Sequence, residues 1–271
     1  RHHVAEGMTV AERLRDRSWL TGTLTRSEWV SRIEGDWQAA RESIDRGLAL
    51  SPMDARLLCV GGLLEYQAGD FEQGEAYLER FLEALRSVAV GPSSEYGFAA
   101  GLMPLIGRIT GSPYRSEIAE SAAQAVLSSA FATPLVTLHT RTGLVLLAVE
   151  RGDVAAAQEQ YAALKPLQGI VVPQFLVSVD RLLGLLAHTM GNIDQAAEHS
   201  EDALAFCRKA GYRTELAWAC CDDADTLLQR DNPGDRERAM SLLDESLAIS
   251  TELGMRPLME RVLSRRDILR A

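Results

Sequence analysis

Apolar residues recur at helical spacing along most of the chain. A clear example is the set Ala239, Leu242, Leu243 and Leu247. Intervals of three and four residues place side chains on one face of an α-helix. No stretch of strand length alternates between apolar and polar residues, which is the pattern of a half-buried strand. The chain is therefore predicted to be all-α, with essentially no sheet.

Glycine followed by Asp, Asn or Ser divides these helical stretches at regular intervals. The glycines are Gly35, Gly69, Gly111, Gly152, Gly191 and Gly234, which lie 34 to 43 residues apart. The copy at Gly111 matches least well. Glycine readily adopts the left-handed conformation that ends a helix, and the polar residue after it can cap the next helix. Each glycine therefore predicts a tight turn between two helices.

Prolines mark a second set of turns that alternates with the first. They are Pro52, Pro92, Pro134, Pro173 and Pro257, and each precedes an apolar periodic stretch. Proline is tolerated in the first turn of a helix. The repeated unit is then a pair of helices, present about six times, and such pairs must stack to bury their apolar faces. We predict one domain over residues 1–271, a right-handed α-solenoid with a capping helix at Pro257–Ile268.

Small residues lie five and twelve positions after the turn glycines, and the position nine after them is typically bulky. Two such sets are Gly35, Ala40, Ile44, Gly47 and Gly191, Ala196, Ser200, Ala203. The pattern resembles tetratricopeptide (TPR) repeats, although Phe81 and Leu164 replace the last small residue in two copies. The segment 213–269 is similar to the C-terminal arrays of bacterial LuxR-type regulators and of signalling ATPases linked to adenylyl or guanylate cyclases. The resemblance implies a helical platform for interaction or regulation.

Composition limits the partners and the compartment. The 271 residues carry a formal net charge of -10, which repels phosphate backbones and disfavours nucleic acid as a partner of this region. The sequence shows no signal peptide, no apolar run of membrane-spanning length and no CxxC pair, which suits a reducing compartment. We expect a cytoplasmic protein without membrane contact. Because the chain begins at Arg1 and not at methionine, we expect a fragment of a longer protein, with an ATPase or effector domain attached.

Two cysteines and three aspartates lie together in the sequence ELAWACCDDADTLL, residues 215–228. Adjacent residues on a helix point about 100° apart, so Cys220 and Cys221 are poorly placed to share a metal ion. The apolar register takes Cys220 into the packing face. It leaves Asp222, Asp223 and Asp225 on a solvated arc, where replacing Asp222 by alanine is expected to have a mild effect. We predict a packing helix, not a metal or redox site.

No catalytic motif appears in the sequence, since HExxH, GxSxG and Walker-type sequences are all absent. His188 and His199 lie on two helices of one predicted pair. Without a matching carboxylate spacing, a satisfied or surface histidine is favoured over a metal ligand. We therefore predict no catalytic residues, no cofactor and no metal.

The remaining candidate surface is the concave groove that stacked pairs form, which the first helix of each pair usually lines. Polar residues interrupt these apolar helices at corresponding places, and His139 matches Ser178 across one period. The candidate protein-binding residues are His139, Arg141, Ser178, Arg181, Trp218 and Asp222. An ordinary solvated helix face is the simpler interpretation, and a groove that accepts a peptide or helix is the functional one.

These observations predict a non-catalytic platform for protein interaction or regulation, belonging to a bacterial signalling or transcription-regulating protein. Its partner is expected to be a protein or peptide in the concave groove. The alternative is a small-ligand sensor domain that controls an attached ATPase or cyclase. A helical-repeat enzyme is disfavoured because no catalytic motif is present.

Overall fold

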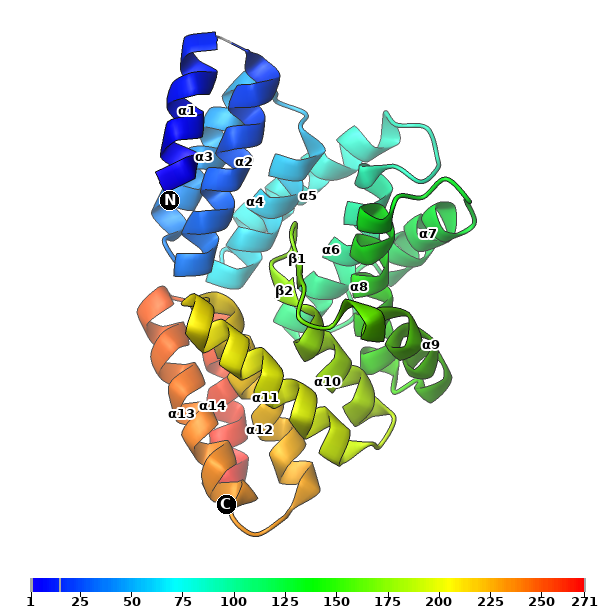
Figure 1. The fold of residues 1–271 in the computed structure, drawn as a ribbon, viewed down its shortest axis with the longest axis vertical. Helices are drawn as coiled ribbons and strands as arrows, with labels where there is room; N and C mark the ends of the chain where they lie inside the picture. Colours follow the sequence, from blue (N-terminus) through cyan, green and yellow to red (C-terminus); the bar gives the residue numbers. More distant parts are fainter. Residues whose placement is uncertain (1, 15, 271) are drawn as a thin grey trace.

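A computed structural model describes residues 2–14 and 16–270. The two end residues of the predicted domain, Arg1 and Ala271, lie outside the described residues. Fourteen α-helices account for most of the described chain (Figure 1), so the prediction of an all-α protein is confirmed. The helices are α1 (His2–Leu14), α2 (Arg17–Glu34), α3 (Trp37–Leu50), α4 (Ala55–Ala68), α5 (Phe71–Arg86), α6 (Ser94–Thr110), α7 (Ser116–Leu127), α8 (Pro134–Arg151), α9 (Val154–Leu164), α10 (Val179–Thr189), α11 (Ile193–Ala210), α12 (Arg213–Arg230), α13 (Asp235–Leu253) and α14 (Arg256–Arg270). No described helix is both long and apolar enough to cross a membrane.

Glycine turns end four helices where the sequence predicts them. Helices α2, α4, α6 and α8 each end at a glycine with φ between 60° and 82°, namely Gly35, Gly69, Gly111 and Gly152. The residue after the turn caps the next helix, as where Asp36 Oδ1 accepts a hydrogen bond from Ala39 N at 3.0 Å. The order differs near residue 234, because the left-handed residue that follows α12 is Asp231, and Gly234 is the residue just before α13.

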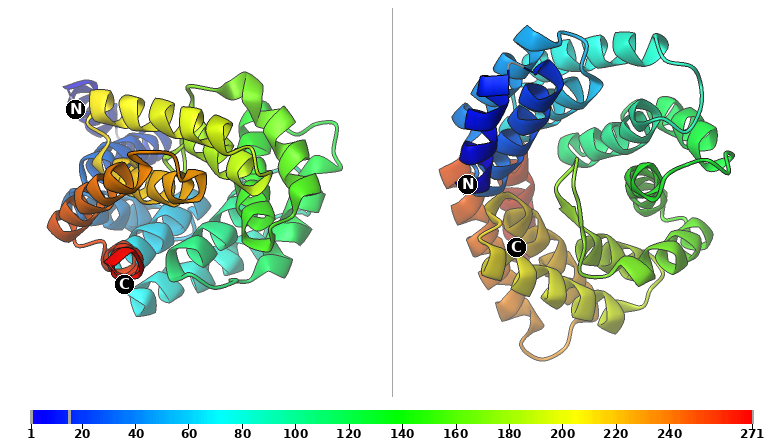
Figure 2. Two further views of the ribbon diagram at one scale, coloured as in Figure 1. Left: turned by 90° about the horizontal axis from the view of Figure 1, so that it is seen from below. Right: turned by 45° about the horizontal axis from the view of Figure 1, so that its top comes forward.

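Six alternate helices contact one another in a closed cycle. Helices α2, α4, α6, α8, α10 and α12 each contact the next in this series, and α12 returns to contact α2. We call these six helices the inner ring. The helix after each ring helix packs against it, and α14 contacts α4, α6 and α13. The chain therefore curves until its C-terminal helices pack against its N-terminal helices (Figure 2).

Polar side chains hold this closure together. Arg256, at the start of α14, donates to the carbonyl oxygens of Ala68 and Gly69 at 3.1 and 3.0 Å. The Trp37 indole N–H donates to the carbonyl of Leu253. The predicted capping helix is confirmed as a helix, and it also fastens the C-terminal part of the chain to the N-terminal part.

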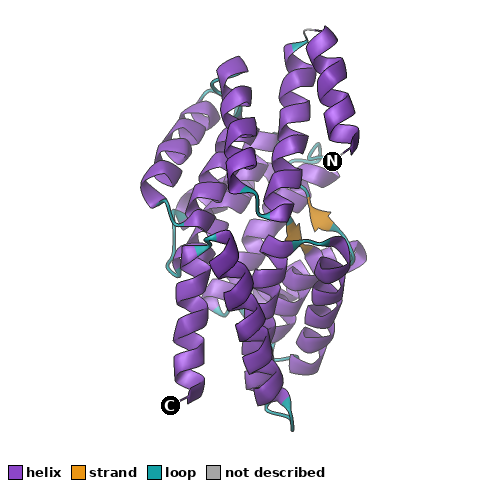
Figure 3. Ribbon diagram, turned by 90° about the vertical axis from the view of Figure 1, so that its left-hand side faces the viewer, coloured by secondary structure: helices purple, strands orange, loops and turns teal. Residues whose placement is uncertain are grey.

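A short hairpin interrupts the helical pattern between α9 and α10 (Figure 3). A 3₁₀ turn, Lys165–Leu167, leads to strands β1 (Val171–Val172) and β2 (Val177–Ser178), which pair antiparallel. Pro173 lies in the turn between the strands, so the prediction of a helix directly after this proline is wrong. The two strands have only two residues each, and the prediction of essentially no sheet is confirmed for the described residues. The residue before a proline avoids the helical conformation, and valines favour extended chain.

Candidate functional site in the inner ring

The hairpin occupies the interior of the inner ring. Phe175, in its turn, is 2% exposed, and its ring centroid lies 5.5 Å from that of His139 on α8. A side chain at Gly101 would overlap the Phe175 ring, so glycine is needed there. Arg32 of α2 donates to the Gln174 carbonyl oxygen at 2.9 Å. The hairpin thus fills space where the sequence predicts a peptide groove.

Two carboxylates of α12 meet two arginines at the centre of the ring. Arg181 of α10 donates to both oxygens of Glu215 at 2.7 and 3.1 Å, and to Asp222 Oδ2 at 2.9 Å. Arg108 of α6 donates to Asp222 Oδ1 at 2.5 Å. Arg181, Glu215 and Asp222 are all buried. Buried charges are stable only when they are paired and hydrogen-bonded in this way.

Burial and ion pairing act in opposite directions on these groups. Burial alone would raise the pKa of Asp222, but Arg108 and Arg181 more than offset it, and the pKa lies below its ordinary value. Burial is the stronger effect at Glu215 and raises the pKa of that carboxyl despite Arg181. Burial lowers the pKa of Arg181, yet Glu215 and Asp222 together leave it above its usual value. The network therefore favours ionised Asp222 and Arg181 at neutral pH.

Arg261 brings a third guanidinium into the interior from α14. Its Cζ atom lies 5.4 Å from the centroid of the Trp218 ring. Burial, followed by the positive charge of Arg108, lowers the pKa of Arg261. Nη1 of Arg261 and Nε of Arg108 are buried and have no hydrogen-bond partner among the described residues. Two neighbouring arginines therefore keep donors for an acceptor from outside the chain.

Three cavities meet at Arg108. The central one has a volume of about 20 Å³ and is lined by side chains from all six ring helices, which leaves room for about one water molecule. A second cavity of about 180 Å³ lies between α6, α8 and α14, with Arg108, Leu146, Glu150 and Arg261 in its wall. A third, of about 300 Å³, includes Arg108 and Asp222 in its wall.

The structure brings five of the six predicted binding residues into the interior. The five buried side chains are His139, Ser178, Arg181, Trp218 and Asp222. Arg141 lies apart from them, because its Nη1 donates to Gln160 Oε1 on α9 at 2.8 Å. His139 and Ser178 do not occupy equivalent places, since one lies within α8 and the other ends β2. The five interior residues contact other parts of the same chain.

The cysteine–aspartate cluster of α12 is enclosed on more sides than the sequence predicts. Cys220 is buried, as predicted, and so is Cys221. Asp222 is 5% exposed and Asp223 is 0% exposed, so the prediction of a solvated arc is wrong for both. Of the three aspartates, Asp225 alone keeps partial contact with solvent and is half-buried. Helix α12 contacts α2, α10, α11 and α13, which leaves little of its surface to solvent.

Sequence reasoning missed Arg108, Glu215 and Arg261. They come from α6, α12 and α14, which lie far apart in the sequence, so local spacing does not connect them. A weak signal was present, because Arg108 is the only basic residue in the apolar sequence SEYGFAAGLMPLIGRIT. A largely buried positive charge in such a helix needs a partner from elsewhere in the fold.

Asp223 makes the stability of the protein depend on pH. Burial raises the pKa of Asp223 from 3.8 to about 6. Between these values the folded protein keeps a proton that the unfolded chain releases, so stability falls as the pH rises. Asp223→Asn removes this titration, and we expect the stability of the variant relative to wild type to increase by about 2–3 kcal/mol between pH 4 and pH 7. Urea unfolding at both pH values measures this difference, and a constant difference would contradict the assignment.

No protein-family model matches this chain, and no curated protein shows a significant match to it.

Proposed function

We propose that this chain is a regulatory domain without catalytic activity, built as an α-solenoid of TPR-like helix pairs, and that it binds a small anionic ligand in its interior. One observation carries the proposal: Arg108 Nε and Arg261 Nη1 are buried beside one cavity, and neither has a hydrogen-bond partner in the part of the chain that the structure describes. Guanidinium groups can donate two parallel hydrogen bonds to a pair of oxygens of a carboxylate or a phosphate. An anionic group between the two arginines would satisfy both donors and offset their mutual repulsion.

The local charge balance supports an anion, although the whole chain carries a net charge of -10. Three arginines face two carboxylates at the centre of the ring, which leaves one positive charge in excess among these five groups. They are Arg108, Arg181 and Arg261, with Glu215 and Asp222. Glu150 in the cavity wall is exposed and can accept a hydrogen bond from a hydroxyl or amino group. The ligand class is therefore a small molecule with a carboxylate or phosphate at one end and a donor at the other.

A ligand in the second cavity would contact α6, α8 and α14 together. Helix α14 also carries Arg256, which fastens the C-terminal part of the chain to the end of α4. Anion binding would therefore stabilise the closed form of the array. A ligand can shift such an equilibrium only if it binds one form more tightly, and Arg261 contributes to the site only while α14 is docked.

The test is an isothermal titration with inorganic phosphate, pyrophosphate and succinate as probes. We expect saturable binding of at least one probe, and Arg261→Met should weaken it at least tenfold. The variant should fold normally, because Arg261 forms no ion pair among the described residues, and its removal relieves both the burial of a charge and the repulsion from Arg108. Unchanged affinity in the folded variant would contradict the proposed site.

Arg266→Met is the matched control. Arg266 lies on the same helix, but its Nη2 is 2.8 Å from Asp244 Oδ1 of α13, and it does not line the cavity. The substitution removes the same charge and should leave probe affinity within about twofold of wild type, because screening weakens distant charges. Equal losses in both variants would indicate a general charge effect and not a site.

A protein-interaction platform is the second candidate, and an apolar groove between α1 and α2 favours it. Val10, Leu14 and Trp19 are 52%, 62% and 62% exposed, and they line a groove of about 410 Å³. Exposed apolar side chains gathered in one place are typical of a protein contact. A peptide in the interior, by contrast, would have to displace the hairpin. The two candidates use separate surfaces, so Arg261→Met leaves the outer groove intact.

A further inference from the structure

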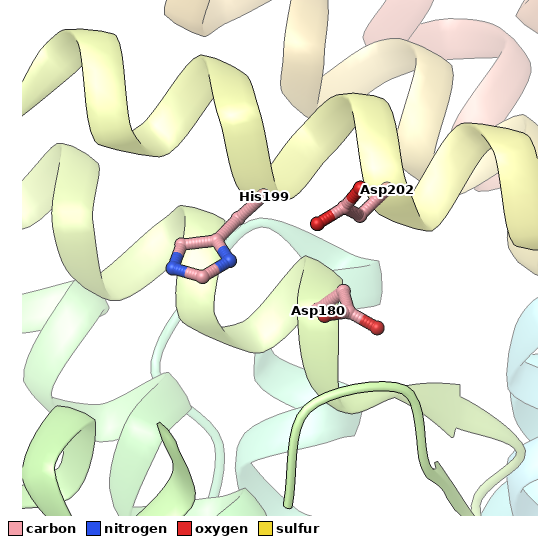
Figure 4. Close-up of side chains that lie close together, drawn as sticks. All are labelled: Asp180, His199 and Asp202. Carbon is pink, nitrogen blue, oxygen red and sulfur yellow. The ribbon is translucent and has the colours of Figure 1, made fainter. Parts of the chain in front are cut away.

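Three side chains that can bind metal converge beside the root of the hairpin, outside the arginine network. Asp180 lies in the first turn of α10, and His199 and Asp202 lie one turn apart on α11. One donor atom from each lies within 4.8 Å of the others (Figure 4). Asp180 and His199 are each 3% exposed, whereas Asp202 reaches the surface.

Each of these side chains uses one polar atom in a hydrogen bond within the protein. The bonds join His199 Nε2 to Tyr161 Oη at 2.9 Å, Asp180 Oδ2 to Gly169 N at 3.0 Å, and Asp202 Oδ2 to Gln168 Nε2 at 3.0 Å. The opposite atoms, His199 Nδ1 and Asp180 Oδ1, are buried without a hydrogen-bond partner among the described residues. A buried polar atom of this kind costs free energy unless something binds it.

We propose that Asp180, His199 and Asp202 bind a divalent transition-metal ion of the Zn²⁺ class, with water completing the coordination. One imidazole nitrogen and two carboxylate oxygens are accepted zinc ligands at about 2.0–2.2 Å, and three protein ligands with one open position are a known arrangement. Calcium and magnesium prefer ligand sets made of oxygen only, so the imidazole favours the zinc class. The donor atoms need to close by about 1 Å around such an ion, which the exposed Asp202 can supply.

The hydrogen bonds behind the ligands suit this role. A metal-bound histidine usually donates its other ring N–H to a neighbouring group, and Tyr161 Oη can accept that hydrogen from Nε2. Lys165 Nζ lies 3.5 Å from Nε2 and opposes a cation, but the two carboxylates outweigh this single positive charge.

The site would fix the segment that leads into the hairpin. Gln168 and Gly169 hold the two aspartates through the bonds described above, and β1 begins at Val171. An ion bound to α10 and α11 therefore also orders this segment. The consequence is a metal clamp that keeps the hairpin inside the inner ring.

A zinc titration of the full chain tests the proposal. His2 and His3 are 79% and 95% exposed beside Glu6, so both are first replaced by alanine to remove a competing surface site. In that background we expect one equivalent of Zn²⁺ to bind, and Asp202→Asn to weaken binding at least tenfold. Because Asp202 is exposed, this variant should fold. Co²⁺ bound in the same background should give the visible absorption of a low-symmetry site.

Asp194→Asn is the matched control, because Asp194 is an exposed aspartate in the first turn of the same helix. Its affinity for Zn²⁺ should equal that of the background protein. Tyr161→Phe should weaken binding less than Asp202→Asn, since it removes a supporting bond and not a ligand. Absence of saturable binding in the background protein, or equal binding by the Asp202→Asn protein, would overturn the proposal. Neither result depends on whether the arginine cavity binds an anion.

Discussion

Replacing Asp222 by alanine is expected to lower the free energy of unfolding by about 3–5 kcal/mol, the usual effect of breaking a buried ion pair from one side. The carboxylate accepts hydrogen bonds from both Arg108 and Arg181. Without it, three guanidinium groups face Glu215 alone in the interior. Urea unfolding followed by circular dichroism measures the loss. The mild effect that the sequence pattern predicts for this change should not be observed.

Asp225→Ala is the matched control on the same helix. Asp225 pairs with Arg265 at 2.6 Å, but the two side chains are 29% and 28% exposed. Ion pairs that solvent reaches contribute about 0–1 kcal/mol, and this pair is only partly buried, so the variant should lose much less stability than Asp222→Ala. Similar losses for the Asp222 and Asp225 variants would contradict the buried network.

Replacing Gly143 by alanine is the second change with a large expected effect. Gly143 lies on α8 at its crossing with α6, and a Cβ atom there would be 1.9 Å from the carbonyl oxygen of Ala100. The obstacle is backbone, so the two ring helices must move apart. Overpacking typically costs about 1–3 kcal/mol and occasionally more, and we expect a loss of about 3 kcal/mol in thermal or urea unfolding.

Gly22→Ala separates this clash from helix propensity. Gly22 also lies within a helix, but the nearest atom to an added Cβ is at the flexible end of Arg26, 3.5 Å away. Alanine exceeds glycine in helix propensity by about 1 kcal/mol, so this variant should be slightly more stable than wild type. If Gly143→Ala and Gly22→Ala both increase the stability, α6 and α8 do not approach each other as closely as described.

The regular part of the fold follows from local sequence signals. Glycine turns and the aspartates after them depend on backbone conformation and on nearest neighbours, so Gly35 and Asp36 are readable from the sequence. Helical periodicity also places Ala196 correctly in the core, where it is 0% exposed. These features need no knowledge of distant contacts.

The interior could not be predicted in the same way. Periodicity treats polar residues of a helix as its solvent face, and this assumption fails for Asp222 because the closure of the ring encloses α12. The partners that make its burial tolerable come from α6 and α10. Closure depends on the angles between successive helix pairs, which accumulate over the whole array and leave no short motif.

The hairpin and the histidine site show two further limits. Apolar composition around Pro173 is compatible with a buried helix or a buried strand, and composition alone does not decide between them. The spacing of His199 and Asp202 places both on one face of α11, but the third side chain comes from α10. The sequence places His199 and His188 on two helices of one pair, but His188 instead contacts Gln229 of α12.

The most direct measurement is anomalous diffraction from crystals soaked in selenate, an anion whose selenium can be located without ambiguity. An anion site between Arg108 and Arg261 predicts a selenium peak within hydrogen-bonding reach of Arg108 Nε and Arg261 Nη1. The same soak of Arg261→Met crystals should lack this peak. Selenium only at surface arginines of the wild-type protein, with the interior cavity empty, would contradict the account.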